Sequence, residues 1–79
     1  MQSDNTILEI IGKGIKERRA ALGLSQEKLA ELSGVDRSFI CGIERGTNNV
    51  SVLTLCQLTQ ALGTDFQEFV SSLPQSKAE

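Results

Sequence analysis

Apolar residues recur at helical spacing along almost the whole chain. No stretch shows the alternation of apolar and polar residues, rich in Val, Ile and Thr, that is typical of a β-strand. Glycines and polar N-terminal capping residues divide the pattern into five predicted helices. We therefore expect an all-α fold, a compact five-helix bundle with a folded core over about residues 7–73 and a frayed tail at 74–79.

The first predicted helix covers roughly residues 7–21, and Gly23 ends it as a left-handed cap. Gly12 and Gly14 weaken this helix, each by about 1 kcal/mol relative to Ala. Its apolar stripe consists of Leu8, Ile11, Ile15 and Leu22.

Each of the other four predicted helices begins at a polar residue whose side chain can accept hydrogen bonds from free backbone amides. In chain order these N-caps are Ser25, Asp36, Ser51 and Asp65. The helices end at Gly34, Arg45, Gly63 and Pro74. The second helix is about eight residues long and has an apolar face of Leu29, Ala30 and Leu32.

Composition limits the chemistry that the chain can perform. Its 79 residues suffice for one domain. There is no His, so an imidazole proton shuttle or metal ligand is excluded, and Cys41 and Cys56 form no C-x-x-C unit. With no convergent acidic pair and no phosphate-binding glycine loop, we expect no enzyme, no metal and no cofactor.

Neither a signal peptide nor an apolar run of membrane-spanning length is visible, so we expect a soluble, cytoplasmic protein without membrane contact. The net charge of −2 argues against a nucleic-acid partner at first sight. Residues 13–45, however, carry seven basic and five acidic side chains. Because charges act within a Debye length of about 10 Å, this local excess of positive charge matters more than the charge of the whole chain.

Residues 25–46, SQEKLAELSGVDRSFICGIERG, form two short predicted helices joined by a tight turn. The small Ala30 lets the two helices approach closely, and Gly34 allows a turn with positive φ. Val35 and Ile40 fill the angle between the helices. This is a helix-turn-helix pattern, in which we expect Cys41 to pack as a small buried residue.

The sequence resembles the Cro and phage-repressor-like (XRE-type) helix-turn-helix transcriptional regulators, most closely short single-domain forms such as restriction-modification controller proteins. The resemblance runs from about Ile11 to Val70 and rests on RRAALGLSQEKLAELSGV, DRSFICGIERG, the Asn49-Val50-Ser51 entry with TLCQLTQALG, and DFQEFV. It implies a lambda-repressor-like DNA-binding domain with the helix-turn-helix in its second and third helices.

The function that the resemblance implies is transcriptional regulation by a homodimer bound to a pseudo-palindromic operator in double-stranded DNA. Controller proteins and phage repressors fit equally well. An antitoxin-like module, with a protein as its main partner and DNA binding secondary, is the alternative. No small-molecule substrate is evident from the residues.

The resemblance assigns roles at the start of the third helix. Arg37 is expected to read a base, because a guanidinium can donate two hydrogen bonds to guanine. Ser38 is a second base contact. Asp36 caps the helix and contacts a base only where it meets a cytosine amino group. Gly42 stands where some relatives carry a long base-contacting side chain.

Further contacts are expected with the DNA backbone. Gln26 would contact a phosphate at the start of the second helix. After the third helix, the resemblance implies backbone or minor-groove contacts from Thr47, Asn48 and Asn49, and Arg45 would add a phosphate contact. Several relatives carry Arg in place of Asn48, and the two asparagines also suit a turn.

Two further expectations concern the protein itself. In the family, the residues matching Arg19 and Glu44 form a partly buried ion pair between the first and third helices, so we expect that pair here. The fifth helix carries more apolar side chains than one small core needs. We therefore predict that the fifth helix and part of the fourth form a two-fold homodimer interface. The residues expected from the fifth helix are Phe66, Phe69, Val70 and Leu73.

Overall fold

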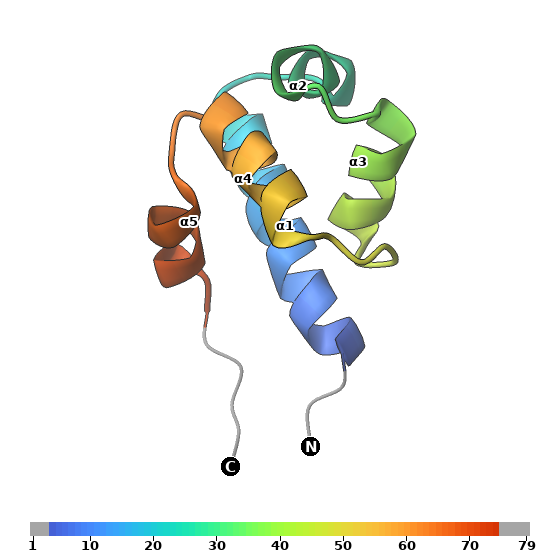
Figure 1. Cartoon of the computed structure of the whole chain (residues 1–79), viewed down its shortest axis with the longest axis vertical. Coiled ribbons are helices and arrows are strands. Elements are labelled where there is room, and N and C mark those ends of the chain that lie inside the picture. Colours follow the sequence, from blue (N-terminus) through green and yellow to red (C-terminus); the bar gives the residue numbers. More distant parts are fainter. Residues whose placement is uncertain (1–3, 75–79) are drawn as a thin grey trace.

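The computed structural model describes residues 4–74. These residues form five helices and no strand, so the predicted all-α five-helix fold is confirmed. In chain order the helices are α1 (Asp4–Ala21), α2 (Gln26–Ser33), α3 (Arg37–Arg45), α4 (Val52–Ala61) and α5 (Phe66–Ser72). Figure 1 shows α1 and α4 at the centre, with α5 along one side and α3 at the opposite edge, below α2. Residues 75–79, most of the expected tail, lie outside the described part.

The predicted N-caps begin their helices as expected. The Ser25 hydroxyl accepts from the backbone N–H of Lys28 at 2.9 Å, and Ser51 and Asp65 cap α4 and α5 in the same way. Between α2 and α3, Gly34 has φ 77°, a left-handed conformation that a side chain would disfavour. The tight turn of the helix-turn-helix is therefore present.

The structure differs from the sequence prediction in three places: the start of α1, Leu22 and Leu32. The helix α1 begins at Asp4 rather than near residue 7, because polar residues extend it without adding to its apolar stripe. Leu22 follows the end of α1 and is 55% exposed, so it is not part of the stripe. Leu32 is 52% exposed because it lies on the side of α2 turned away from the core.

The core lies between α1 and the other four helices. Val35 and Ile40 are buried in it, as expected for the angle between α2 and α3. Its other buried apolar members are Ile15, Leu29, Ile43, Leu55, Leu58, Leu62 and Phe69.

The burial of Phe69 removes this residue from the predicted dimer interface. Its side chain is fully buried, at 0% exposure. A Cβ placed on Gly14 of α1 would come within 3.0 Å of the Phe69 ring and 2.6 Å of the Leu73 side chain. Because α1 lacks a side chain at this point, α5 packs closely and draws Phe69 into the core. Phe69 is therefore a core residue and presents no surface to a second copy.

The helices α1 and α3 cross closely at Gly12. A Cβ on Gly12 would lie 2.1 Å from the carbonyl oxygen of Ile43. The glycine that weakens α1 as an isolated helix is therefore what allows α3 to dock against it. No helix within residues 4–74 has the length and apolar character that a membrane span requires.

Candidate nucleic-acid interface

The side of α3 that faces away from the core carries two arginines. Arg37, Cys41 and Arg45 follow one another at four-residue spacing and so share one stripe of the helix. Arg37 and Arg45 are exposed, and neither forms an ion pair with another residue in the described range 4–74. About 12 Å of helix axis separates them, at 1.5 Å per residue. The stripe therefore carries two exposed cations that form no salt bridge within residues 4–74.

Cys41 was expected to be buried, but it is half-buried. It lies on the same stripe as the two arginines and so faces away from the main core. Its neighbour Ile40 takes the fully buried position instead.

Asp36 and Ser38 form a closed capping unit at the start of α3. The Asp36 carboxylate accepts the backbone N–H of Ser38 at 2.9 Å and also the Ser38 hydroxyl. These hydrogen bonds, chiefly the one from the hydroxyl, lower the pKa of Asp36. Because the hydroxyl proton is committed to Asp36, Ser38 can offer outward only the lone pairs of its oxygen.

The predicted ion pair between Arg19 and Glu44 is present. Arg19 Nε donates to Glu44 Oε2 at 2.7 Å and Nη2 donates to Oε1 at 2.9 Å, a bidentate pair. The side chains are 15% and 3% exposed. Arg19 Nη1 also donates to the backbone oxygen of Leu24 at 2.8 Å, so the pair ties α1 and the α1–α2 turn to α3.

The pair changes both pKa values. Burial acts to raise the pKa of Glu44, but the hydrogen bonds from Arg19 and Gln26 outweigh it and leave that pKa below its usual range. The hydrogen bond to Glu44 raises the pKa of Arg19. Both groups therefore remain charged in the folded protein.

Gln26 has a contact that sequence reasoning did not anticipate. Its Nε2 donates to Glu44 Oε1 at 2.9 Å, which ties the first residue of α2 to α3. One amide hydrogen and the carbonyl oxygen have no role in this bond. The expected phosphate contact of Gln26 stays a prediction, and the bond to Glu44 fixes where the side chain lies.

The loop after α3 is held against the helix. Gly46 has φ 76° and closes α3 in a Schellman motif, with its N–H donating to the Ile43 carbonyl. The backbone N–H and the hydroxyl of Thr47 both donate to the Gly42 carbonyl, at 3.0 and 3.2 Å. Asn48 is half-buried and Asn49 is exposed. These loop residues therefore lie beside the outward face of α3.

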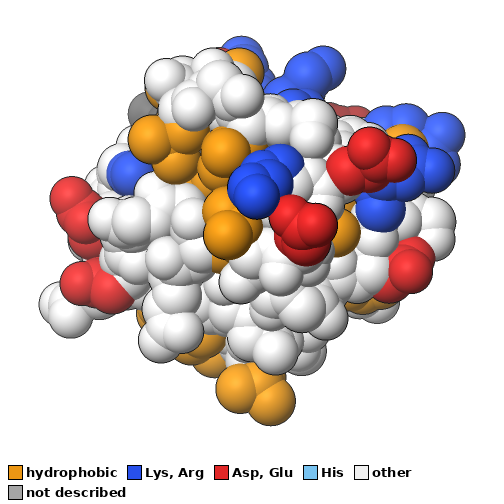
Figure 2. Space-filling view, turned by 90° about the horizontal axis from the view of Figure 1, so that it is seen from above, with side chains coloured by type: hydrophobic (Ala, Val, Ile, Leu, Met, Phe, Trp, Pro, Cys, Tyr) orange, Lys and Arg blue, Asp and Glu red, His pale blue; other side chains and the backbone are white. Residues whose placement is uncertain are grey.

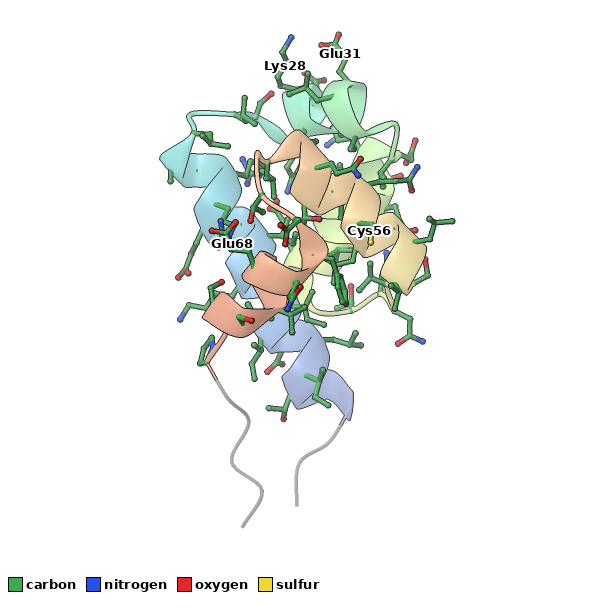
Figure 3. The ribbon with its side chains drawn as sticks, turned by 60° about the vertical axis from the view of Figure 1, so that its left-hand side comes forward. Lys28, Glu31, Cys56 and Glu68 are labelled. Atoms are coloured by element: carbon green, nitrogen blue, oxygen red, sulfur yellow. The ribbon has the colours of Figure 1, made fainter. Side chains whose placement is uncertain are left out.

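Two other basic residues, Arg18 and Lys28, make contacts away from α3. The Arg18 guanidinium lies 5.6 Å from the centre of the Phe69 ring and donates to the Ser72 hydroxyl at 3.1 Å, so it belongs to the contact between α1 and α5. Lys28 pairs with Glu31 at 3.1 Å, and both side chains point away from the body of the molecule (Figure 3). Charges of both signs and apolar side chains are mixed on the end of the molecule seen in Figure 2, so that end is not a uniform basic patch.

The helix-turn-helix model HTH_3 matches residues 15–69, which include α2, α3 and the loop that follows. The chain belongs to this helix-turn-helix family. It is 38% identical over 65 residues to the control protein C.SmaI of Serratia marcescens, covering 82% of this chain and 77% of that protein. It is also similar to the HTH-type transcriptional regulator PuuR of Escherichia coli, at 40% identity over 60 residues, which are 76% of this chain and 32% of PuuR.

Solved structures agree with this assignment. The restriction-modification controller protein C.AhdI of Aeromonas hydrophila superposes with a TM-score of 0.78 at 45% identity, over 81% of this chain and 97% of that one. The controller protein C.Esp1396I, crystallised as a tetramer with its natural 35 base-pair operator, superposes with a TM-score of 0.76 at 33% identity, over 81% of this chain and 84% of that one. The expected resemblance to controller proteins is confirmed. Within residues 4–74, no cluster of side chains suited to a metal ion is found.

Proposed function

We propose that this chain is a sequence-specific DNA-binding regulator of transcription that acts in the cytoplasm as a homodimer on a pseudo-palindromic operator. It needs no catalysis, cofactor or metal. The observation that carries the proposal is the outward stripe of α3, where Arg37 and Arg45 have no ion-pair partner in the described chain. The stripe is held rigidly by the ion pair behind it and by the Gly12 crossing.

The start of α3 supplies the base contacts. Arg37 donates to the O6 and N7 atoms of a guanine in the major groove. Ser38 accepts from an adenine or cytosine amino group, because its hydroxyl donates its hydrogen bond to the Asp36 carboxylate. Asp36 contributes a base contact only at cytosine, since its carboxylate repels phosphate.

The flanks of α3 supply the backbone contacts. Arg45, at the far end of the stripe, and Gln26, at the start of α2, contact phosphates on either side of the groove. Thr47, Asn48 and Asn49 approach the backbone from the loop. These contacts position the helix, whereas the base contacts select the sequence.

A second copy of the chain would occupy the apolar groove between α1, α4 and α5. The groove has a volume of about 590 Å³ and is lined by Ile7, Val52, Phe66, Val70 and Leu73, among others. Ile7, Val52 and Val70 are 47%, 64% and 43% exposed. A two-fold dimer through this groove keeps three of the four residues predicted for the interface, without Phe69, and keeps the expected part of α4. It adds residues of α1. The tetrameric operator complex of C.Esp1396I supports association of this kind.

Selection of binding sites from random duplex DNA tests the proposal. The wild type should enrich a two-fold symmetric site with half-sites about 34 Å apart, one helical turn of DNA. The Arg37→Ala variant should remain folded by circular dichroism and lose preference at one base pair per half-site. The matched control Arg45→Ala should bind more weakly to all sequences and keep the same preferred site.

A folded wild type that enriches no sequence would contradict the proposal. The helix-turn-helix would then serve protein contacts, as in an antitoxin-like module, and isolation of its protein partner would be the next experiment.

A further inference from the structure

A second groove runs along α1 and the end of α5, beside the apolar groove proposed for the dimer. It has a volume of about 660 Å³, and the residues that line it span α1 from Thr6 to Ala21 and reach Pro74 after α5. Ile10 and Leu73 line both grooves, so the two adjoin. Unlike the apolar groove, the second one is lined by charged side chains of α1, and we call it the charged groove.

Three charges of alternating sign follow one another along the charged groove. Glu9, Lys13 and Glu17 are spaced by four residues, so they lie on one stripe of α1. All three are exposed, and none forms an ion pair with another residue of the described range 4–74. The groove's other cation, Arg18, is bound to Ser72 of α5. The stripe therefore carries charges of both signs that can pair with an outside partner.

A second copy of the chain has complementary charges on this same stripe. If two α1 helices lie antiparallel about a two-fold axis midway between Lys13 and Glu17, Lys13 of each copy faces Glu17 of the other. Two pairs of opposite charge form at once. The same arrangement brings the half-buried Ile10 of each copy opposite the small, exposed side chains of Ala20 and Ala21. Parallel helices in register would instead place like charges opposite each other.

The position of Glu9 favours this register over the one that would pair Glu9 with Lys13. A Cβ placed on Gly46 would lie 2.8 Å from the Glu9 Cγ atom and 3.0 Å from its Cα atom. The Glu9 side chain therefore begins against the end of α3. Glu17 lies about two turns further along α1, away from that contact.

We infer that the charged groove is a second contact between copies of this chain, which joins one dimer to another through antiparallel α1 helices paired by Lys13 and Glu17. Because exposed ion pairs stabilise an interface only weakly, this contact is weaker than the one through the apolar groove. It forms at protein concentrations well above the micromolar range.

This contact leaves the outward stripe of α3 uncovered. Gly12 and Arg19 are the residues through which α1 meets α3, whereas the charged groove lies beside the end of α5. Figure 1 shows α3 and α5 on opposite sides of the molecule. Two dimers joined through the charged groove can therefore hold two DNA duplexes. This consequence rests on the proposed DNA-binding function, whereas the contact itself does not.

Sedimentation well above the micromolar range, without DNA, tests the contact. Lys13→Glu and Glu17→Lys, each folded by circular dichroism, should weaken the association of dimers roughly tenfold, because each reversal makes two attractive pairs repulsive. An equimolar mixture of the two variants should associate at least as strongly as the wild type, since an acidic stripe then faces a basic one. The matched control Lys16→Glu makes the same charge change on α1 outside the groove and should leave association unchanged.

A capture assay tests the consequence for DNA. Beads that carry the selected duplex should retain a second, fluorescent copy of it when wild-type protein is added. Lys13→Glu and Glu17→Lys should keep the base preference of the wild type, retain about tenfold less of the second duplex, and regain retention when mixed. The general attraction to DNA changes in opposite directions in these two variants, so a loss common to both reports the contact.

The outcomes separate the possible failures. A wild type that never associates beyond the dimer would show that a second copy does not occupy the charged groove. If the mixture associates no better than the separate variants, the charges act within each helix and the inference is wrong. If dimers associate as expected but the protein selects no duplex, the contact stands and the proposed function fails.

Discussion

At the scale of single residues, Glu44 is the side chain on which the most contacts converge. It accepts from Arg19 twice and from Gln26 once, and so joins α1, α2 and α3 at one carboxylate. With its side chain 3% exposed, the charge is stable only because these donors surround it. The orientation of α3, the helix proposed to enter the major groove, therefore depends on a buried charge that lies behind its outward stripe.

Replacing Arg19 by Ala should destabilise the fold by about 3 kcal/mol, the low end of the range for a broken buried pair, because Gln26 still donates to Glu44. Chemical denaturation followed by circular dichroism measures this. Lys13→Ala, which removes an exposed charge from the same helix, is the control and should change stability little. An equal effect of both variants would contradict the role given to the pair.

Acid should lower the free energy of unfolding, because it protonates the Glu44 carboxylate. The folded pKa of Glu44 lies below its unfolded value of about 4.3, so the stabilisation is fully present above that pH and is lost as the pH falls through the folded pKa. Asp36, whose pKa is also lowered, contributes with the same sign. Glu44→Gln should be less stable at neutral pH and lose less stability between neutral pH and pH 3 than the wild type. Parallel pH profiles for the two proteins would contradict this account.

Some residue roles were readable from the sequence and others were not. The Arg19–Glu44 pair was expected because the family motif fixes both positions. The contact of Gln26 with Glu44 and that of Asn48 with Gly42 depend on how loops and helix ends fold back, which the order of residues does not reveal. Phe69 and Val70 are adjacent apolar residues on α5, but only the packing against Gly14 decides that the first is buried and the second exposed.

At the scale of helices, the crossing of α1 over α3 determines how far α3 stands from the core. The two backbones approach at Gly12, where any side chain would meet the Ile43 carbonyl. Sequence reasoning treated this glycine as a weakness of α1, because helix propensity is a local property and the crossing is not. The starts of the helices were predicted well, because N-capping is a local property. Ser25, for example, accepts a hydrogen bond from the backbone N–H of the residue three positions later.

Gly12→Ala should lower the free energy of unfolding by about 1–3 kcal/mol despite the better helix propensity of Ala, because a Cβ there would lie 2.1 Å from the Ile43 carbonyl oxygen. Thermal denaturation measures the change. At the exposed Ala20 of the same helix, the reverse substitution Ala20→Gly should cost up to about 1 kcal/mol, as propensity alone requires. If Gly12→Ala raised the melting temperature, the close crossing would be refuted.

At the scale of the whole molecule, the faces proposed for DNA and for a second copy belong to different parts of the structure. The outward stripe belongs to α3, whereas the apolar groove is lined by residues of α1, α4 and α5. Figure 1 shows α3 and α5 on opposite sides of the molecule. Two copies joined through the groove can therefore each present an α3 to one half-site. The sequence analysis predicted a two-fold interface on the fifth helix and part of the fourth, whereas the position of Ile7 of α1 beside the groove follows only from the folded shape.

Val70→Glu should convert the dimer to a monomer in sedimentation at micromolar concentration while the helical content is kept, because it places a charge in the apolar groove. Leu53→Glu is the matched control: Leu53 is 73% exposed on α4 and does not line the groove, so its variant should remain a dimer. A wild type that sediments as a monomer both with and without DNA would contradict the dimer.

The most direct test of the central claim is the affinity of the wild-type protein for its selected duplex relative to a scrambled duplex of equal length, titrated at several salt concentrations. We expect the selected site to be bound at least about a thousandfold more tightly, with affinity for both duplexes falling as salt increases. Equal affinity for the two duplexes at every salt concentration would contradict sequence-specific recognition by α3.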